Sequence, residues 1–307
     1  MIYQLYNRLT SGKEKRGFLR FWTRLSANIL IYLLALTPDR KKDSKDNRTP
    51  ILISLTSFPA RIGQLWKIIE ILLRQQGDLP RVNVVLWLSE EQFSSKASLP
   101  LRLLRQEKRG LQIRLMPDNL MPHKKYYYAF QDFSDHIVIT VDDDVLYPLD
   151  LIQKLYKTHL LHPQSVCCNR GRIIPQEKIA DTNADISYHR WKIVHQTDEA
   201  TTNDRILPTG VGGVLYPPHC YDERIFDIDA IKRTCLVGDD LWLNFMCRLK
   251  GTHIVHSPNQ TRYITLFAWK KQSLFKSNVD NSQNDRQIAQ ISEWAVPHVG
   301  KTFYDGL

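Results

Sequence analysis

The fold of this chain is limited most by a series of short, almost wholly apolar runs, which alternate with helical patterns. The apolar runs are residues 51–58, 82–89, 111–116 and 136–141. The helical patterns are residues 64–76, 99–110, 122–133, 149–161 and 238–251. Strands that are apolar on both faces and alternate with helices are typical of a parallel sheet covered on both sides. The sequence therefore predicts an α/β fold, with ligands bound beyond the carboxyl ends of the strands.

The positive charge of the chain lies mainly in its N-terminal arm, residues 1–48. This arm holds eleven Lys and Arg residues and four acidic residues, which give it +7 of the net charge of +10. The other 259 residues therefore carry only +3. Because this body is nearly neutral and lacks a pattern of interleaved basic and aromatic residues, we expect no nucleic-acid partner.

The arm also contains an apolar run, 25-LSANILIYLLAL-36. At 12 residues, this run is shorter than the roughly 20 residues that span a bilayer. Arginines precede the run, and the basic tract 40-RKKDSKDNR-48 follows it. We interpret residues 17–36 as a helix that lies in the membrane interface, so that residues 17–48 contact a membrane surface. The alternatives are an ordinary helix packed on the protein and a self-association helix.

The cysteines favour a reduced compartment. There are five of them, Cys167 and Cys168 are adjacent, and none forms a CxxC motif. This pattern argues against a disulfide framework and against a zinc site. The apolar run of the arm starts too late for a secretory signal, and no A-x-A cleavage site follows it. We therefore expect a cytoplasmic protein, peripheral on the inner face of the cell membrane.

Three aspartates, Asp142, Asp143 and Asp144, directly follow the apolar run 136–141. In an extended chain the side chains of Asp142 and Asp144 leave on one face. Two such carboxylates suit a hard divalent cation, Mn²⁺ or Mg²⁺, and three adjacent negative charges repel one another without a counter-ion. Asp143 would then face a ribose hydroxyl or a backbone amide. The alternative is a helix N-cap, although one cap needs only one aspartate.

Five segments of the chain together resemble GT-A fold bacterial glycosyltransferases, family-2-like enzymes of the kind encoded in surface-polysaccharide gene clusters. They are 53-ISLTSFPARI-62, 85-VLWLSEEQF-93, 139-ITVDDDVLYP-148, 209-TGVGGVLYPP-218 and 238-GDDLW-242. The resemblance covers about residues 50–275 and leaves the N-terminal arm outside. It implies a GT-A-like mixed, mostly parallel sheet flanked by helices, and an acidic DxD motif that binds a divalent metal and the diphosphate of a nucleotide-sugar.

The resemblance also implies a division of the chain. Residues 1–48 would be the arm and linker, and residues 49–307 a single GT-A-like catalytic domain. Within that domain we expect a nucleotide-sugar half at about 49–150, an acceptor half at about 151–275 and a C-terminal tail at 276–307. The weakly periodic segment 175–203 would fold over the site, and residues 278–287 would close over it as a lid.

The resemblance assigns donor binding to residues at the ends of the predicted strands and in the glycine loop. These residues are Thr56, Ser57, Arg61, Glu90, Lys124, Lys125, Asp142, Asp143, Gly212 and Gly213. Simpler interpretations stay open for several of them. Arg61 suits a surface position at a helix start, Glu90 suits a first helical turn, and Lys124 and Lys125 suit solvent. The glycine loop suits a tight hairpin turn, although small residues there would let backbone amides approach a sugar or phosphate.

The second acidic centre, Asp239 and Asp240, matches the position at which inverting relatives carry their base. A sugar hydroxyl is a poor nucleophile, so a positioned carboxylate that takes its proton strengthens it. We expect Asp240 as this base and Asp239 as the second choice, and we expect the pair also to cap its helix. His256, in preference to His253, would join Asp142 and Asp144 in the metal shell.

The sequence thus predicts a metal-dependent glycosyltransferase that moves a sugar from a nucleotide-sugar donor to a saccharide or lipid-linked acceptor. One alternative is an aspartate-dependent phosphotransferase or phosphatase, which needs a nucleophilic Asp after the first strand. That strand instead ends in Thr56 and Ser57. The other alternative is a non-enzymatic basic binding protein, which the near-neutral body disfavours.

Overall fold

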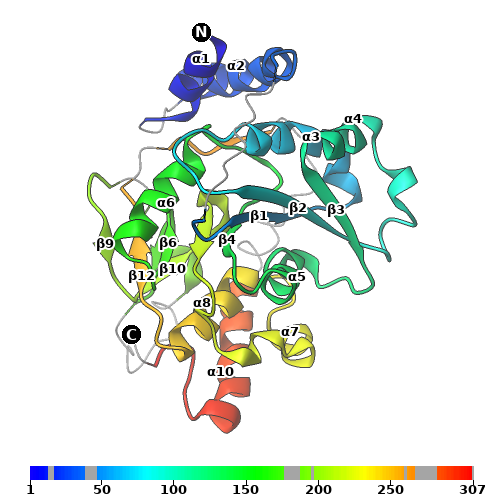
Figure 1. Cartoon of the computed structure of the whole chain (residues 1–307). Coiled ribbons are helices and arrows are strands. Elements are labelled where there is room, and N and C mark those ends of the chain that lie inside the picture. Colours follow the sequence, from blue (N-terminus) through cyan, green and yellow to red (C-terminus); the bar gives the residue numbers. More distant parts are fainter. Residues whose placement is uncertain are drawn as a thin grey trace.

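An eight-stranded mixed sheet organises the chain, in the order β3-β2-β1-β4-β11-β6-β12-β9 (Figure 1). The structure is a computed structural model that describes residues 1–12, 17–38, 47–175, 187–194, 197–258, 261–266 and 282–305. The strands of this sheet are β1 (Ile51–Thr56), β2 (Val82–Ser89), β3 (Leu111–Met116), β4 (Ile137–Thr140), β6 (Val166–Cys168), β9 (Thr201–Thr202), β11 (Val214–Tyr216) and β12 (Ile254–His256).

Most neighbouring strands of this sheet are parallel. The pairs β1–β2, β1–β4, β2–β3 and β6–β12 are parallel, whereas β11 runs antiparallel to both β4 and β6, and β9 runs antiparallel to β12. Two small sheets complete the fold: β10 (Ile206–Pro208), β7 (Gly171–Ile173) and β8 (Ile193–Val194) form one, and β13 (Ile264–Thr265) and β5 (Val145–Leu146) form the other. The predicted α/β class, with a mixed and mostly parallel sheet, is confirmed.

Both faces of the central strands are buried, which explains their continuously apolar sequences. In β1, Ile51, Ile53 and Leu55 belong to one hydrophobic cluster and Leu52 to the other. Because successive side chains of a strand point to opposite faces, one strand serves two cores. The first core packs on α1 (Ile2–Thr10), α2 (Gly17–Ala35), α3 (Pro59–Leu73) and α6 (Leu151–Leu161). The second packs on α5 (Lys124–Asp132), α7 (Ile228–Thr234), α8 (Asp239–Leu249) and α10 (Gln283–Val299).

Several predicted elements differ in their bounds. Helix α3 begins at Pro59 rather than at residue 64, because proline suits the first helical turn, where its missing N–H costs nothing. The helix expected over 99–110 is instead a short α4 (Leu101–Leu104) followed by the 3₁₀ helix η2 (Arg105–Arg109). Gly110 ends it in the left-handed region, as expected for a helix stop.

The C-terminal segment is a helix, which the sequence did not predict. Residues 282–287, expected as part of a polar lid, are the N-cap and first turns of α10, and residues 278–281 lie outside the described residues. Ile288, Ile291 and Trp294 bury one side of α10 against the second core, where the Trp294 and Trp242 ring centroids lie 5.0 Å apart. Of the expected covering segment 175–203, residues 176–186 and 195–196 also lie outside the described part.

Both helices of the N-terminal arm pack on the body: Ala27, Ile31 and Leu34 of α2 lie in the first core, as expected for a helix packed on the protein, and the membrane contact of residues 17–48 stays a prediction. Tyr6 is completely buried, and its hydroxyl donates a hydrogen bond to the backbone oxygen of Tyr147 at 2.9 Å. The side-chain oxygen of Asn7 accepts a bond from the backbone N–H of Leu149 at 2.7 Å. Among the described residues, no helix is long and apolar enough to cross a membrane.

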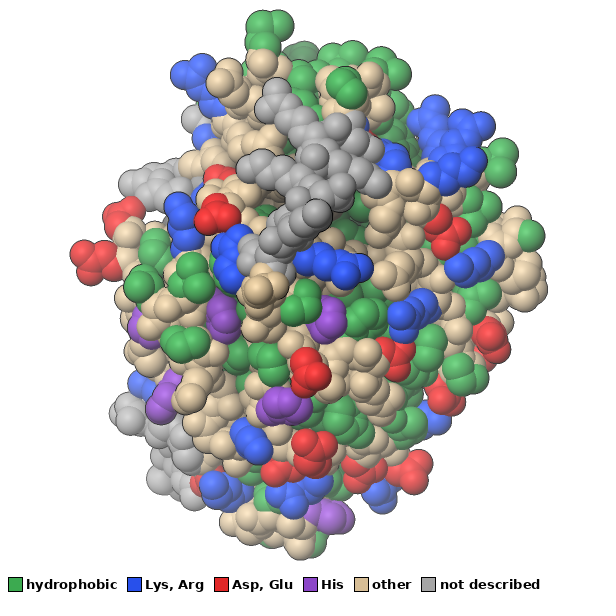
Figure 2. All heavy atoms as spheres, viewed as in Figure 1, with side chains coloured by type: hydrophobic (Ala, Val, Ile, Leu, Met, Phe, Trp, Pro, Cys, Tyr) green, Lys and Arg blue, Asp and Glu red, His purple; other side chains and the backbone are tan. Residues whose placement is uncertain are grey.

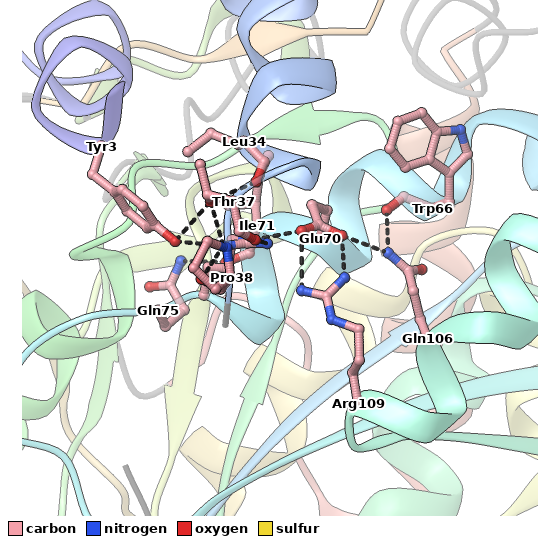
Figure 3. A network of polar contacts seen from close by, with 11 residues as sticks. Tyr3, Leu34, Thr37, Pro38, Trp66, Glu70, Ile71, Gln75, Gln106 and Arg109 are labelled. Carbon is pink, nitrogen blue, oxygen red and sulfur yellow. Dashed lines mark hydrogen bonds and ion pairs between the residues drawn. The ribbon is translucent and has the colours of Figure 1, made fainter. Parts of the chain in front are cut away.

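A buried ionic cluster also ties the arm to α3 (Figure 3). Glu70 accepts hydrogen bonds from Arg74 at 2.5 Å and from both terminal nitrogens of Arg109. Arg74 in turn donates to the hydroxyls of Tyr3 and Thr37 and to the Thr37 carbonyl oxygen. Burial opposes the charge of Glu70, but the two arginines outweigh it and lower the pKa of this carboxyl. We call these five residues the Glu70 cluster.

Candidate active site

The aspartate triplet lies where β4 ends, next to antiparallel β11. The chain turns at Asp143 and Asp144, so the alternation of an extended strand, on which the prediction rested, does not apply here. The three side chains nevertheless differ in exposure. The side chains of Asp142 and Asp144 are 30% and 33% exposed, whereas that of Asp143 is only 7% exposed. Two carboxylates therefore reach solvent and the middle one is buried.

Asp143 and Asp144 are held by Arg61, in the first turn of α3, and by Ser57, two residues before the helix begins. The Ser57 hydroxyl donates to Asp143 at 2.6 Å, and Arg61 donates to the other oxygen of Asp143 at 2.5 Å. The second terminal nitrogen of Arg61 lies 3.1 Å from Asp144. Arg61 is thus not the plain surface residue that the simpler interpretation allowed. Burial raises the pKa of Asp143 even though Arg61 and Ser57 oppose the shift.

Lys125, near the start of α5, joins the two acidic centres. Its Nζ atom lies 3.1 Å from Asp142 Oδ1 and 2.9 Å from Asp239 Oδ2. Burial opposes its charge, but Asp142, Asp239 and Asp240 raise the pKa of Lys125 well above its ordinary value. Asp142 after β4 and the acidic pair that opens α8 therefore belong to one site. The interpretation of Lys125 as a solvated lysine is wrong.

Lys124 is also buried rather than solvated. Its Nζ atom donates to Asn119 Oδ1 at 2.8 Å. Burial lowers the pKa of Lys124 to about 8, although Glu91 opposes the shift. The structure thus separates two adjacent lysines, of which only Lys125 contacts the aspartates.

At Gly210 the packing of the site leaves no room for a side chain. A Cβ atom at this position would lie 2.8 Å from Asp142 Oδ1 and 2.9 Å from Lys125 Nζ, closer than real Cβ contacts allow. Its backbone N–H points at Asp240, with 3.2 Å to each carboxylate oxygen. Gly210 belongs to the segment TGVGG, but no local feature of the sequence distinguishes it from the later glycines.

The two glycines that the sequence singled out serve the backbone around them. A Cβ at Gly212 would lie 2.7 Å from the Cβ of Arg170 and 2.9 Å from its backbone nitrogen. Gly213 has a φ angle of 77°, in the region that glycine adopts most easily. The donor-binding role of Gly212 and Gly213 stays a prediction.

Asp240 lies in the first turn of α8 and is half-buried. Burial and the neighbouring charge of Asp239 raise its pKa to about 8, although Lys125 and the Gly210 N–H oppose this. The N-cap of α8 is Gly238, and no side chain makes a capping hydrogen bond there. The expectation that the acidic pair caps its helix is therefore wrong: both aspartates follow the cap and face the site instead.

A cavity of about 190 Å³ lies between the acidic groups and a second wall. Asp142, Asp239 and Asp240 line one side, and Arg170, Arg172, Tyr188 and Asn284 also contribute to its lining. Arg170 donates to the Thr209 hydroxyl at 3.2 Å, and Arg172 donates to the backbone oxygen of Tyr188 at 3.3 Å. The sequence did not single out this second wall. The available signal was the motif 170-RGR-172, which follows the apolar run of β6.

Three other predicted residues lie outside this cavity lining. Thr56 donates its hydroxyl hydrogen to the backbone oxygen of Trp87, 2.8 Å away in β2. Glu90 is exposed in the turn after β2. His256 is fully buried in β12, with its Nδ1 3.0 Å from the Thr197 hydroxyl. Their donor-binding and metal-binding roles stay predictions.

The carboxylate oxygens of the aspartate triplet suit a hard divalent cation. Asp142 and Asp144 offer partly exposed carboxylate oxygens, the ligand type that Mn²⁺ and Mg²⁺ prefer. Burial, together with the charges of Asp142 and Asp143, raises the pKa of Asp144 to about 6 in spite of Arg61. A further positive charge would therefore stabilise the triplet. Within the described ranges, no group of three or more His, Cys, Asp or Glu side chains is arranged to hold a metal by itself.

Comparisons with known proteins give similarities of fold. No family model and no curated protein matches the chain. One similar solved structure is the mannosyltransferase PcManGT from Pyrobaculum calidifontis in complex with GDP-Man and Mn²⁺ (TM-score 0.47, 10% identity, 96% of this chain and 76% of that chain covered). Another is GalNAc-T7 with UDP, GalNAc and Mn²⁺ (0.47, 11%, 96% and 62%), and a third is a UTP-bound UGPase from Acinetobacter baumannii (0.42, 8%, 82% and 94%). The chain thus spans less than two thirds of the GalNAc-T7 chain.

Proposed function

We propose that the protein is a metal-dependent glycosyltransferase that moves a sugar from a nucleotide-sugar donor to a hydroxyl of a saccharide or lipid-linked acceptor in surface-polysaccharide synthesis. One observation carries this proposal. Lys125 contacts both Asp142 and Asp239, so two acidic centres from distant parts of the chain border one cavity. Such a site can hold a diphosphate through one centre and activate a hydroxyl through the other.

The first acidic centre, at Asp142 and Asp144, binds the nucleotide-sugar donor. Asp142 and Asp144 would hold Mn²⁺ or Mg²⁺, which stabilises the negative charge that develops on the departing nucleoside diphosphate. Arg61 and Ser57 fix Asp143, and through it the backbone turn that carries the two exposed carboxylates. Lys125 keeps its positive charge because three aspartates surround it, and it holds Asp142 at a set distance from the second centre.

The second acidic centre, at Asp239 and Asp240, activates the acceptor hydroxyl. As the acceptor oxygen attacks the anomeric carbon, its proton passes to Asp240, and the bond from that carbon to the diphosphate breaks with inversion. A pKa of about 8 suits a base that works near neutral pH. The Gly210 N–H orients the Asp240 carboxylate. Asp239 is the weaker candidate, because Lys125 already pairs with one oxygen of its carboxylate.

The proposal includes the place where the reaction occurs. Residues 17–48 attach the protein to the cytoplasmic face of the cell membrane, which brings the cavity near a lipid-linked acceptor. Residues 49–150 supply the donor half of the site, and residues 151–275 supply the acceptor half. In support, the cavity is lined by Asp142 from the first range and by Arg170, Tyr188 and Asp240 from the second.

A donor screen tests the proposal. Nucleotide sugars are incubated with the protein and Mn²⁺, released nucleoside diphosphate is detected, and the new linkage is determined by NMR. We expect Asp142→Asn and Asp144→Asn each to lower turnover at least about 100-fold, whereas the exposed control Asp135→Asn keeps it. Full turnover in both site variants would reject the metal assignment. Release of inorganic phosphate instead of nucleoside diphosphate would favour a phosphatase.

A further inference from the structure

Helix α2 is apolar on both sides, but the described residues of the protein cover only one of them. Its inner side buries Ala27, Ile31 and Leu34 in the first core. Its outer side exposes Phe18, Leu19, Phe21, Trp22, Ile29, Tyr32 and Leu33, with Phe18 at 77% exposure, and Leu36, the first residue after the helix, is 82% exposed. A surface helix normally carries polar residues on the side away from the core, so this outer face needs a partner.

The exposed aromatic residues gather at the start of the helix. The rings of Phe18 and Phe21 each lie 5.8 Å from the ring of Trp22, in edge-to-face contact. In Figure 2, hydrophobic side chains gather at the top of the molecule, over α1 and α2, with Lys and Arg side chains beside them. Aromatic side chains flanked by cations are typical of surfaces that enter the headgroup region of a bilayer.

A cavity of about 270 Å³ opens beside these aromatic residues, between α2 and β13. Three arginines line it: Arg20, Arg24 and Arg262. Arg24 donates to the backbone oxygens of Thr265 and Leu266, and Arg262 donates to those of Arg8 and Leu9, so backbone contacts fix both guanidinium groups. Guanidinium groups held in this way bind phosphate oxygens well, because their N–H groups match the spacing of those oxygens.

Charge distinguishes the possible partners of this face. The arm carries +7 within residues 1–48. A second copy of the chain, related by two-fold symmetry, would bring an identical basic arm against this one, which like-charge repulsion opposes. An anionic bilayer offers negative charge and an apolar layer together.

We propose that the outer face of α2 and the arginine cavity form one binding surface for an anionic bilayer, in which a lipid phosphate enters the cavity while Phe18, Phe21 and Trp22 enter the headgroup region. This inference deepens the membrane attachment that is part of the proposed function, and names the lipid chemistry that it recognises.

The same cavity is connected to the aspartate triplet through backbone hydrogen bonds. Its wall includes β13, which pairs with β5, the strand that follows Asp144. Directly after β13, the Leu266 N–H donates to the backbone oxygen of Asp144 at 2.9 Å. A lipid phosphate in the cavity is thus bound beside the strand that supports the triplet, which suits an enzyme whose acceptor is embedded in the same bilayer.

Vesicle sedimentation of the full-length protein tests this surface without any donor. We expect binding to vesicles of phosphatidylcholine and phosphatidylglycerol to exceed binding to phosphatidylcholine alone by about tenfold at low salt. Phe18→Ser combined with Trp22→Ser should lower binding to the anionic vesicles about tenfold. The matched control, Leu160→Ser with Leu161→Ser, replaces two exposed leucines at the end of α6 and should bind as before.

A second pair of variants tests the cavity. Arg20→Gln should weaken binding to the anionic vesicles several-fold and leave binding to neutral vesicles unchanged, whereas the exposed control Arg105→Gln should change neither. Equal binding of the unmodified protein to both vesicle types would overturn the proposal. So would a failure to bind vesicles together with a dimer, seen by analytical ultracentrifugation, that Phe18→Ser with Trp22→Ser dissociates. Vesicle binding without turnover of any donor would instead reject the proposed function alone.

Discussion

Two buried ionic clusters in this protein differ in how their charges balance. In the Glu70 cluster, one carboxylate faces two arginines, and the pKa of Glu70 is lowered. In the candidate site, the cations in direct contact with the acidic groups are Arg61 and Lys125 among the described residues. They face five carboxylates, those of Asp142, Asp143, Asp144, Asp239 and Asp240.

The pKa shifts follow this difference. Burial opposes ionisation in both clusters. In the Glu70 cluster, the two arginines outweigh this effect and lower the pKa of the Glu70 carboxyl. In the site, the pKa values of Asp143, Asp144 and Asp240 are all raised. The Glu70 cluster, which joins the arm to α3, thus neutralises itself, whereas the candidate site is left short of positive charge, as the proposed binding of a cation and transfer of a proton require. Variants of each cluster can test this difference in charge balance.

The largest expected effect comes from Asp240→Asn. If Asp240 is the base, the amide cannot take the acceptor proton, and transfer should fall about 10²- to 10⁴-fold. Donor binding, measured by calorimetry, should persist because Asp142 and Asp144 are intact. The control is Asp229→Asn, which changes an exposed acid in the first turn of α7. Near-normal transfer by Asp240→Asn would refute the base assignment.

Glu70→Gln tests the balanced cluster. The change removes the buried carboxylate charge that Arg74 and Arg109 both contact, so we expect the free energy of unfolding in urea to fall by about 3–5 kcal/mol. Turnover per folded molecule should not change, because Glu70 does not line the cavity. The exposed pair of Glu107 and Lys96 provides the contrast: Glu107→Gln should cost less than about 1 kcal/mol. Equal costs in the two variants would contradict a special role for the buried cluster.

The raised pKa of Asp240 predicts a pH dependence of both rate and stability. Its carboxylate must be ionised to act, so kcat/KM should rise with pH until about pH 8 and then level. Stability should change in the opposite direction. The folded-state pKa lies above the unfolded value, so the folded state keeps a proton that the unfolded state loses, and stability falls as pH rises from about 4 to 8. Asp240→Asn should remove the rise in rate and the fall in stability between about pH 6 and 8, whereas Asp144, with its pKa of about 6, still lowers stability below that range. A rate profile that is flat from pH 6 to 8 in the unmodified protein would contradict this prediction.

Gly210→Ala should have a smaller effect, confined to the site. The added methyl group would meet Asp142 Oδ1 and Lys125 Nζ, and these atoms must move apart to admit it. We expect kcat/KM to fall about 10- to 100-fold, or about 1.4–2.7 kcal/mol. Gly63→Ala, where a Cβ meets no atom within 4 Å, is the control. If both variants keep full activity, the close approach at Gly210 is not needed.

Gly210 also illustrates what the sequence could and could not predict. The strands were predictable because burial of both faces leaves a local pattern, as in Ile51, Leu52 and Ile53. Both acidic centres were visible as short motifs. Which glycine meets Asp142 depends on the path of the chain between residues about 70 positions apart, and no local pattern encodes that path.

The same reason explains the other differences. Arg170 and Arg172 follow β6, and they reach the cavity through the pairing of β6 with β11 and of β7 with β10, contacts that the spacing of residues does not specify. Helix α10 was not predicted because its first turns are polar, and its apolar side becomes evident only against Trp242. For Lys125 the alternative of a solvated lysine stayed open because its partners, Asp142 and Asp239, lie 17 and 114 positions away.

Tyr147→Phe should have the smallest effect and distinguishes the scaffold of the site from its charges. The buried Tyr147 hydroxyl accepts the backbone N–H of Asp142 at 2.9 Å and donates to the Gly210 carbonyl oxygen at 3.4 Å, so it joins the triplet to the glycine loop. Removing it should cost about 1 kcal/mol of stability and lower kcat/KM only several-fold, because no carboxylate or cation is lost. Urea unfolding and donor turnover measure the two quantities.

Tyr6→Phe is the control for this variant, because it removes a hydrogen bond from the N-terminal arm to the Tyr147 backbone. It should cost similar stability but leave kcat/KM unchanged. A large loss of activity in Tyr147→Phe would mean that the position of the Asp142 backbone, as well as the unbalanced charge, governs the site.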